Sequence, residues 1–230
     1  MRGFVLAGSL FITAAGCASA QPEPAPPPAL ETEEHKTLYA LGFAMAGTLG
    51  GATFDDAELE LIQRGLADGV RGAKAQVGME EYGPKLNAMM VARMQLAATK
   101  EQQAGQAYCD SMAQKEGAQR TPAGAIYIET RAGSGATPGP TATVKLHYHG
   151  TLRDGTVFDS SVNKGQPATF RLDGVVPCFS EGVGKMKVGG KATLVCPSDT
   201  AYGERGRPPT IPGGAALTFD VELFEILGGQ

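Results

Sequence analysis

The chain has 230 residues, of which 42% are hydrophobic and 19% charged, and its formal net charge is −4. This length accommodates one or two compact domains with full hydrophobic cores. Residues 17–119 hold 8 Lys/Arg against 14 Asp/Glu, a net charge of −6, whereas residues 120–230 hold 11 against 10, a net charge of +1. Because the sequence has no basic stripe that would neutralise phosphates, we expect no nucleic-acid partner.

The first twenty residues, MRGFVLAGSLFITAAGCASA, have the features of an export signal: an arginine, an apolar run, and small residues around a cysteine. The run is too short to span a bilayer. The stretch Ala14-Ala15-Gly16-Cys17 resembles a bacterial lipobox, and Ala18-Ser19-Ala20 matches an ordinary A-x-A cleavage site. We prefer the lipobox, which makes residues 1–16 a signal peptide and Cys17 the site of lipidation. On either interpretation the mature protein works outside the cytoplasm, where disulfides persist.

The next stretch, QPEPAPPPAL, has five prolines among ten residues and favours an extended spacer. We therefore expect residues 17–30 to hold the lipid-attachment cysteine and a proline-rich tether. Beyond the tether, apolar residues recur at steps of three and four and predict three amphipathic helices. Their stripes are Leu38, Leu41, Met45 and Leu49; Leu59, Ile62, Leu66 and Val70; and Leu86, Met90, Met94 and Ala97.

Two of these helices carry further signals. Asp55 followed by Glu58 predicts an N-cap for the second helix. The third begins near Tyr82 and continues through polar sequence toward Gly117, which gives roughly thirty residues against an average of about eleven to twelve. So small a helical region cannot bury the far half of such a helix, and we expect a homodimer formed through residues 31–119. The alternative is a monomeric three-helix subdomain with a frayed third helix.

From about Thr121 the sequence changes to short alternating segments broken by Gly and Pro, which is typical of an antiparallel sheet. Val144, Leu146 and Tyr148 share one face of a strand, and His147 and His149 point to the other. Further alternating runs are Phe170 with Leu172, and Leu217, Phe219, Val221 and Leu223. A short helix is predicted over residues 179–186. The expected fold class is therefore α+β: an all-α N-terminal part, then a curved antiparallel sheet wrapped around one short helix.

Several motifs within residues 144–227 resemble, in the same order, those of a known family. The segments VKLHYHGTLRDGTVFDSS, VGGKATLVCPSDTAYGERG and IPGGAALTFDVELFEIL closely resemble an FKBP-type peptidyl-prolyl cis-trans isomerase. The upstream part, from LYALGFAMAGTL through GLADGVRG and the long helix, resembles the N-terminal dimerisation domain of the exported macrophage infectivity potentiator and FkpA-like branch. The resemblance implies a helical domain over residues 31–119 and an FKBP-type isomerase domain with a half-barrel sheet over residues 120–230.

The resemblance also implies a shallow hydrophobic pocket that accepts a proline ring. Carried over residue by residue, its catalytic positions are Tyr148, Phe158, Asp159, Tyr202 and Phe219, and its substrate-binding positions are Val175, Val176, Phe179 and Ile211. Two positions depart from the family pattern. Phe179 replaces the tryptophan that commonly forms the pocket floor, and Ala168 replaces a wall phenylalanine of the best-known members. The resemblance implies macrolide inhibitors as candidate ligands, but the smaller floor at Phe179 and the open side at Ala168 leave their affinity unpredicted.

An X–Pro amide crosses a barrier of about 18–20 kcal/mol when it turns, because rotation breaks its resonance. The twisted amide is less polar than either planar isomer, so a dry aromatic pocket favours it over the ground state. We expect the Tyr202 hydroxyl and the Val176 N–H to hold substrate carbonyls, and Tyr148 to hydrogen-bond Asp159. The carboxylate would orient and polarise the amide without attacking it. No cofactor and no metal are needed.

The sequence disfavours two other functions. His147 and His149 lack a CxxC or HExxH pattern, which disfavours a zinc site, and Ser160 lacks the G-x-S-x-G pattern of a serine hydrolase. Cys178 and Cys196 could pair in an oxidising compartment, which would leave Cys109 as a buried thiol or an inter-subunit bridge.

The expected partners are unfolded or proline-containing polypeptides, and the expected role is to assist the folding of exported proteins. The alternative is a periplasmic holdase chaperone in which isomerisation is incidental. The expected location is the outer membrane, as a lipoprotein facing the periplasm or the cell surface, with a soluble periplasmic protein as the alternative.

Overall fold

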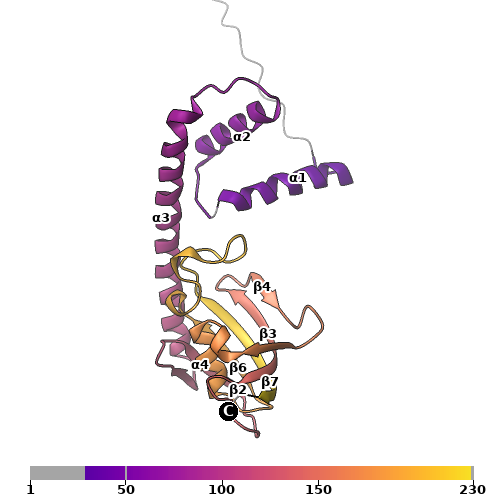
Figure 1. Ribbon diagram of the computed structural model, residues 1–230, viewed down its shortest axis with the longest axis vertical. Coiled ribbons are helices and arrows are strands. Elements are labelled where there is room, and N and C mark those ends of the chain that lie inside the picture. The colour runs from indigo at the N-terminus through magenta and orange to yellow at the C-terminus, as the bar shows by residue number, and fades with distance from the viewer. Residues whose placement is uncertain (1–28, 50, 229–230) are drawn as a thin grey trace, which may run out of the picture. The chain divides into compact units, whose positions relative to one another are not determined.

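The computed structural model describes residues 29–49 and 51–228 (Figure 1). Among the described residues, those up to Leu41 belong to one unit and those from Gly42 onward to a second, so the boundary between the units falls within helix α1 (Glu33–Ala46). The predicted signal peptide, the predicted lipidation site Cys17 and most of the predicted tether lie outside the described residues. Within the described part of the chain, no helix combines the length and the apolar character that a membrane crossing requires.

After α1 and the short 3-10 helix η1 (Gly47–Leu49), the second unit continues with helices α2 (Asp56–Val70) and α3 (Met79–Ala113). The predicted N-cap of α2 is confirmed. The Glu58 N–H donates to the Asp55 carboxylate over 2.9 Å, and the Asp55 N–H donates back to Glu58 over 3.1 Å. This reciprocal pair is a capping box, which satisfies two of the backbone donors that a helix start leaves open.

Helix α3 has 35 residues, so the prediction of one unusually long helix is confirmed, but its ends differ from those expected. It starts at Met79, three residues before Tyr82, which places Pro84 inside its second turn. A proline there removes one hydrogen bond near the helix start, where the remaining turns can still hold the chain. It ends at Ala113, before the glycine that the sequence indicates: Gly117 has φ 74°, a conformation that lies outside any helix.

The rest of the second unit is an antiparallel sheet that, within the described residues, has seven strands. They are β1 (Ala118–Arg120), β2 (Ile126–Arg131), β3 (Thr143–Leu152), β4 (Val157–Ser160), β5 (Ala168–Arg171), β6 (Lys191–Cys196) and β7 (Leu217–Gly228). The strand order is β1-β2-β6-β7-β3-β4. Along its other edge β3 pairs first with β5 and then with β4. Register shifts interrupt the β3–β7 ladder at Val144 and Leu146, and such bulges increase the bend of a sheet.

Helix α4 (Pro177–Lys185) packs against β6 and β7 and provides the other side of the main core (Figure 1). It begins two residues before the predicted Phe179, because Pro177 has the fixed φ that suits the first turn of a helix. The predicted inward faces are confirmed: the side chains of Val144, Leu146, Leu217 and Leu223 are fully buried. The predicted fold class, a helical N-terminal part followed by a half-barrel around one short helix, is therefore correct.

The second unit contains a pair of neighbouring cysteines and, apart from them, one free cysteine. Cys178, in the first turn of α4, and Cys196, at the end of β6, lie close enough to form the predicted disulfide, with a Cα–Cα distance of 5.6 Å. Cys109 on α3 is a free thiol and is fully buried. Its burial raises the pKa of the Cys109 thiol to about 11. A side chain in that position is a packed thiol, which favours the first of the two alternatives for Cys109.

The C-terminal half of α3 packs against the sheet and against the loops that precede β7. Its buried residues are Ala98, Gly105, Cys109 and Met112, and the last two share a small core with Ile126, Val195 and Ala216. Polar contacts flank this core. The Gln102 amide donates to Asp199 over 2.8 Å, and the Tyr108 and Thr218 hydroxyls are 3.0 Å apart. The Arg153 guanidinium donates to both carboxylate oxygens of Glu101, over 2.9 and 3.1 Å.

Candidate active site

One open pocket of about 620 Å³ lies between the concave face of the sheet, the start of α4 and the loop before β7. It brings together all nine residues that the family resemblance assigned to a proline pocket: Tyr148, Phe158, Asp159, Val175, Val176, Phe179, Tyr202, Ile211 and Phe219. Phe170, Gly174, Arg207 and Thr210 complete the lining. Residues from positions 148 to 219 therefore converge on one cavity, which periodicity alone could not establish.

The register of the sheet places three of these side chains together. Gly150 of β3 lies opposite Asp159 of β4 on one side and opposite Phe219 of β7 on the other. A Cβ atom added at Gly150 would lie 2.6 Å from Cζ of the Phe158 ring, closer than real side-chain contacts allow. Because Gly150 has no side chain, the Phe158 ring can pack over it and line the pocket.

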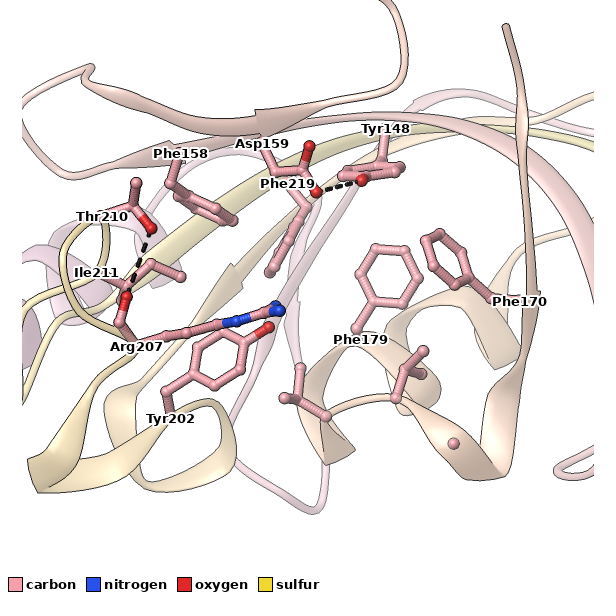
Figure 2. A pocket seen from close by; sticks show the side chains of 13 residues that line it. Tyr148, Phe158, Asp159, Phe170, Phe179, Tyr202, Arg207, Thr210, Ile211 and Phe219 are labelled. Atoms are coloured by element: carbon pink, nitrogen blue, oxygen red, sulfur yellow. Dashed lines mark hydrogen bonds between the residues drawn. The ribbon is translucent and has the colours of Figure 1, made fainter. Parts of the chain in front are cut away.

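Aromatic rings form most of the pocket wall and are packed edge to face (Figure 2). The centroids of Phe158 and Phe219 are 5.5 Å apart with an interplanar angle of 88°, and those of Phe179 and Phe219 are 5.1 Å apart at 73°. Tyr148 meets Phe179 at 6.5 Å and 83°. These are the separations and tilts that aromatic quadrupoles prefer. The rings support one another and leave a preformed hollow.

Asp159 is the acidic residue in this wall, and three donors satisfy it. The Tyr148 hydroxyl donates to one carboxylate oxygen over 2.5 Å (Figure 2). The Lys164 ammonium and the Ser160 backbone N–H donate to the other, over 2.5 and 2.8 Å. Burial by itself raises the pKa of Asp159, but the hydrogen bonds from Lys164 and Tyr148 outweigh it and hold the pKa below its usual value. Asp159 is therefore a carboxylate at neutral pH.

The same contacts shift the pKa of Tyr148 upward. Burial and the hydrogen bond to the Asp159 carboxylate both raise the pKa of the Tyr148 phenol well above its usual value of 10.0. The phenol therefore stays protonated and remains a donor to Asp159. The backbone of Tyr148 is also held, because its N–H donates to the buried Ser161 hydroxyl over 2.8 Å.

His147 and His149 lie outside the pocket lining and contact the serines that follow Asp159. Nδ1 of His147 is 2.9 Å from the Ser161 hydroxyl, and Nδ1 of His149 is 2.9 Å from the Ser160 hydroxyl. These contacts tie β3 to β4 behind Tyr148 and Asp159. Neither serine is aligned with a histidine and a carboxylate in the manner of a hydrolytic triad.

Two hydrogen-bond donors on the other side of the pocket have no partner within the described residues. One is the Tyr202 hydroxyl, at the start of the short helix η4 (Gly203–Arg205), and the other is the backbone N–H of Val176, the N-cap residue of α4. The Val176 carbonyl, by contrast, accepts a hydrogen bond from Ser180 over 3.1 Å. The pocket thus presents free donors opposite an already satisfied carboxylate.

Sequence reasoning missed four lining residues, of which two matter for chemistry. Phe170 shows the inward parity of its strand, and its ring lies 6.0 Å from Phe179, so the alternation could have indicated it. Arg207 is exposed on the loop before β7 and carries no pattern that could have found it. The two departures from the family pattern are both in place: Phe179 lies among the rings, and Ala168 packs at the edge of the core.

The lining has no activated nucleophile and no pair of carboxylates. Its single carboxylate is held in the ionised state by three donors, so it is a poor proton acceptor. What the site can do is desolvate an apolar ring between aromatic side chains while the free donors hold neighbouring carbonyl oxygens. This suits a reaction in which an amide rotates and no bond is broken.

Comparisons with known proteins agree with this chemistry. Residues 135–224 match the family model described as FKBP-type peptidyl-prolyl cis-trans isomerase, and residues 34–128 match the domain amino-terminal to it. The chain is 39% identical over 221 residues to an FKBP-type peptidyl-prolyl cis-trans isomerase FkpA of Aeromonas hydrophila. This alignment covers 90% of this chain and 82% of that protein.

Two relatives from Escherichia coli match over similar lengths. The FKBP-type 22 kDa peptidyl-prolyl cis-trans isomerase is 36% identical and covers 87% of this chain and 98% of that protein. The crystal structure of FkpA aligns with a TM-score of 0.62 at 32% identity, covering 86% of this chain and 98% of that one. Sequence, fold and pocket therefore point the same way: the chain belongs to the FKBP-type peptidyl-prolyl cis-trans isomerases and is an isomerase of X–Pro peptide bonds.

Proposed function

We propose that this isomerase assists the folding of exported proteins and acts through a desolvating aromatic pocket. The observation that carries the mechanism is the convergence of Phe158, Phe179 and Phe219 around an open hollow. A planar X–Pro amide has a resonance dipole that water solvates well, and the twisted amide has lost much of it. A proline ring seated among these rings takes the amide out of water, which costs the planar forms more than the twisted one.

The free donors supply the second part of the mechanism. The Tyr202 hydroxyl and the Val176 N–H hold substrate carbonyl oxygens on one side of the rotating bond. Asp159, fixed by Tyr148 and Lys164, presents a negative oxygen that orients the rotating amide. Holding one half of the substrate while the other half turns converts binding energy into a lower barrier.

The roles can be separated with a proline tetrapeptide assay. Asp159→Asn keeps the shape of the side chain and removes its charge, so it weakens hydrogen bonds that are worth about 1.5–3 kcal/mol when one partner is charged. We expect kcat/KM to fall at least tenfold. Asp154→Asn, at an exposed aspartate outside the pocket, is the matched control and should retain wild-type kcat/KM. Wild-type activity in Asp159→Asn would overturn the role of the carboxylate while leaving the isomerase activity itself intact.

We also propose that the protein is exported, lipidated at Cys17 and dimeric through residues 31–119. Three features support this proposal. The N-terminal sequence carries a lipobox-like stretch, Cys178 and Cys196 are close enough to form a disulfide, and the helices expose large apolar side chains. Among the latter are Leu59, Leu61 and Leu66 of α2 and Leu86, Val91 and Leu96 of α3. A second copy of the chain would cover these faces.

Each element of this proposal has its own test. Mass mapping of protein from its native compartment, without reduction, should find Cys178 joined to Cys196, Cys109 free, and a lipid on Cys17. Three free thiols would reject the disulfide, and an unmodified N-terminus after Ala20 would reject lipidation in favour of a soluble periplasmic protein. Sedimentation equilibrium should give twice the mass of one chain.

Holding unfolded chains is a second candidate function, and the proposed dimer favours it. A dimer carries two pockets on one particle, which raises the effective concentration of the second pocket without new contacts. Suppression of client aggregation by a Phe158→Ala variant tests this function separately. Full suppression without isomerase activity would show that the two functions are distinct.

A further inference from the structure

Arg207 is the one lining residue whose side chain has a charge and no counter-charge among the described residues. The lining contains one acid, Asp159, and Lys164 already pairs with it over 2.5 Å. The Arg207 side chain has no carboxylate within ion-pair distance in the described part of the chain. Among the described residues, the lining of the pocket therefore carries one uncompensated positive charge.

The position of Arg207 is fixed by its backbone while its side chain stays free to meet a ligand. The Arg207 N–H donates to the Ile211 carbonyl over 2.8 Å, and the Ile211 N–H donates back to the Arg207 carbonyl over 3.0 Å. This pair closes the loop that also carries Thr210 and Ile211 of the lining. Figure 2 shows the Arg207 side chain extended into the pocket, with its nitrogen atoms toward the cluster of rings.

We infer that Arg207 is a specificity-determining residue that favours polypeptides with an aspartate or glutamate directly before the proline. This inference rests on the proposed function, in which the proline ring enters the pocket and its neighbours stay at the mouth. The residue before the proline is joined to the rotating amide, so its side chain stays within a few ångströms of the rim. A guanidinium pairs well with a carboxylate there because it offers several donors in a fixed plane.

The pairing of the Asp159 carboxylate with Lys164 is essential to this selectivity. An unpaired carboxylate in the wall would repel an acidic substrate about as strongly as Arg207 attracts it. Because Lys164 and Tyr148 both donate to Asp159, its charge is largely compensated, and the net field at the mouth comes from Arg207. A lysine before the proline should therefore be disfavoured, and an uncharged residue should be intermediate.

The test compares kcat/KM for three tetrapeptides, Ala-Glu-Pro-Phe, Ala-Gln-Pro-Phe and Ala-Lys-Pro-Phe, at low and high salt. Glutamate and glutamine have nearly the same shape, so their ratio isolates charge. Exposed ion pairs of this kind correspond to a preference of roughly two- to fivefold. We expect that preference for Glu over Gln at low salt and a smaller one at high salt, because salt screens an exposed pair.

Three variants complete the design. Arg207→Gln should bring the Glu-to-Gln ratio to about one, and Arg207→Glu should favour the Lys peptide over the Glu peptide. Arg205→Gln, at the exposed arginine that ends η4 two residues before Arg207 and lies outside the lining, is the matched control and should keep the wild-type ratio. A wild-type ratio near one, or an Arg207→Gln ratio equal to that of wild type, would overturn the inference. Failure to accelerate even the Gln peptide would instead overturn the proposed function, so the two failures are distinguishable.

Discussion

The isomerase region (residues 98–228) and the helical region (α2 with the α3 residues before Ala98) use apolar residues in opposite ways. In the isomerase region Leu146, Leu194 and Leu223 are fully buried within one chain. In the helical region no residue of α2 is buried, and Leu66 remains 44% exposed. Both regions show clear apolar periodicity. An apolar stripe therefore predicts that an element forms, but it does not reveal what covers the stripe.

The largest difference between the two regions should appear in a matched pair of leucine truncations. Leu194→Ala removes a fully buried side chain that contacts α4 at Gly182, and such truncations cost about 2–5 kcal/mol. Leu66→Ala removes a half-exposed side chain and should leave the unfolding of the isomerase region unchanged. Denaturant unfolding monitored by the tyrosines of the sheet measures the first effect.

Leu66→Ala has a separate expected effect under the proposal of a dimer. If a second chain covers this face, the variant should weaken association and make the stability of the helices more dependent on protein concentration. Sedimentation equilibrium across a range of concentrations measures this. A Leu66→Ala protein that associates like the wild type would show that the α2 stripe lies outside the dimer contact.

The same contrast explains how far the sequence could predict the site. Alternation in β3 and β7 placed Tyr148 and Phe219 inward, because a strand with one buried face allows only one register. Family resemblance was needed for Tyr202 and Val176, which lie on irregular segments without a period. Neither the strand alternation nor the family resemblance indicated Arg207. An exposed arginine in a loop has the same sequence pattern whether it faces solvent or a pocket, and only the loop closure by Ile211 decides between them.

The proposed disulfide between Cys178 and Cys196 gives the second largest expected effect. It joins residues 18 positions apart, and closing a loop of about this length contributes roughly 3 kcal/mol in the chain-entropy model. Replacing both Cys178 and Cys196 by alanine should lower the unfolding free energy of the isomerase region by about that amount. The helical region should keep its own transition. Reduction of the wild type should reproduce the loss, and an unchanged midpoint after verified reduction would contradict the prediction.

A pair of glycines on helices tests where the isomerase region begins along α3. Gly65 of α2 has open space around it, so Gly65→Ala should stabilise its helix by up to about 1 kcal/mol. A Cβ at Gly105 of α3 would lie 3.0 Å from the Ala216 Cβ and 3.2 Å from the Ala216 backbone nitrogen. Overpacking of this kind costs about 1–3 kcal/mol, which should cancel or exceed the gain in helix propensity.

The glycine pair also bears on the pocket, because Ala216 belongs to the segment that connects the loop of Tyr202 and Ile211 to β7. Thermal unfolding measures the stability difference, and the tetrapeptide assay shows whether Gly105→Ala also disturbs the lining. Equal stabilisation by both substitutions would mean that α3 can move away from Ala216 at little cost. In that case the isomerase region would begin after α3.

The smallest expected effect is the pH dependence of the ion pair between Glu58 and Arg93, which ties α2 to α3. The hydrogen bond from Arg93, followed by that from the Asp55 N–H, lowers the pKa of Glu58 from 4.5 to about 2. Because the folded-state pKa is depressed, the stabilisation is fully present above pH 4.5 and is lost as pH falls toward about 2.

Glu58→Gln retains an acceptor for the capping box but removes the charge. Wild type should therefore exceed the variant in helix stability at neutral pH, and circular dichroism melts should show the difference closing near pH 2. If the stability difference between wild type and Glu58→Gln persists unchanged at pH 2, it arises from the capping box. The charge of Glu58 would then not stabilise the contact between α2 and α3.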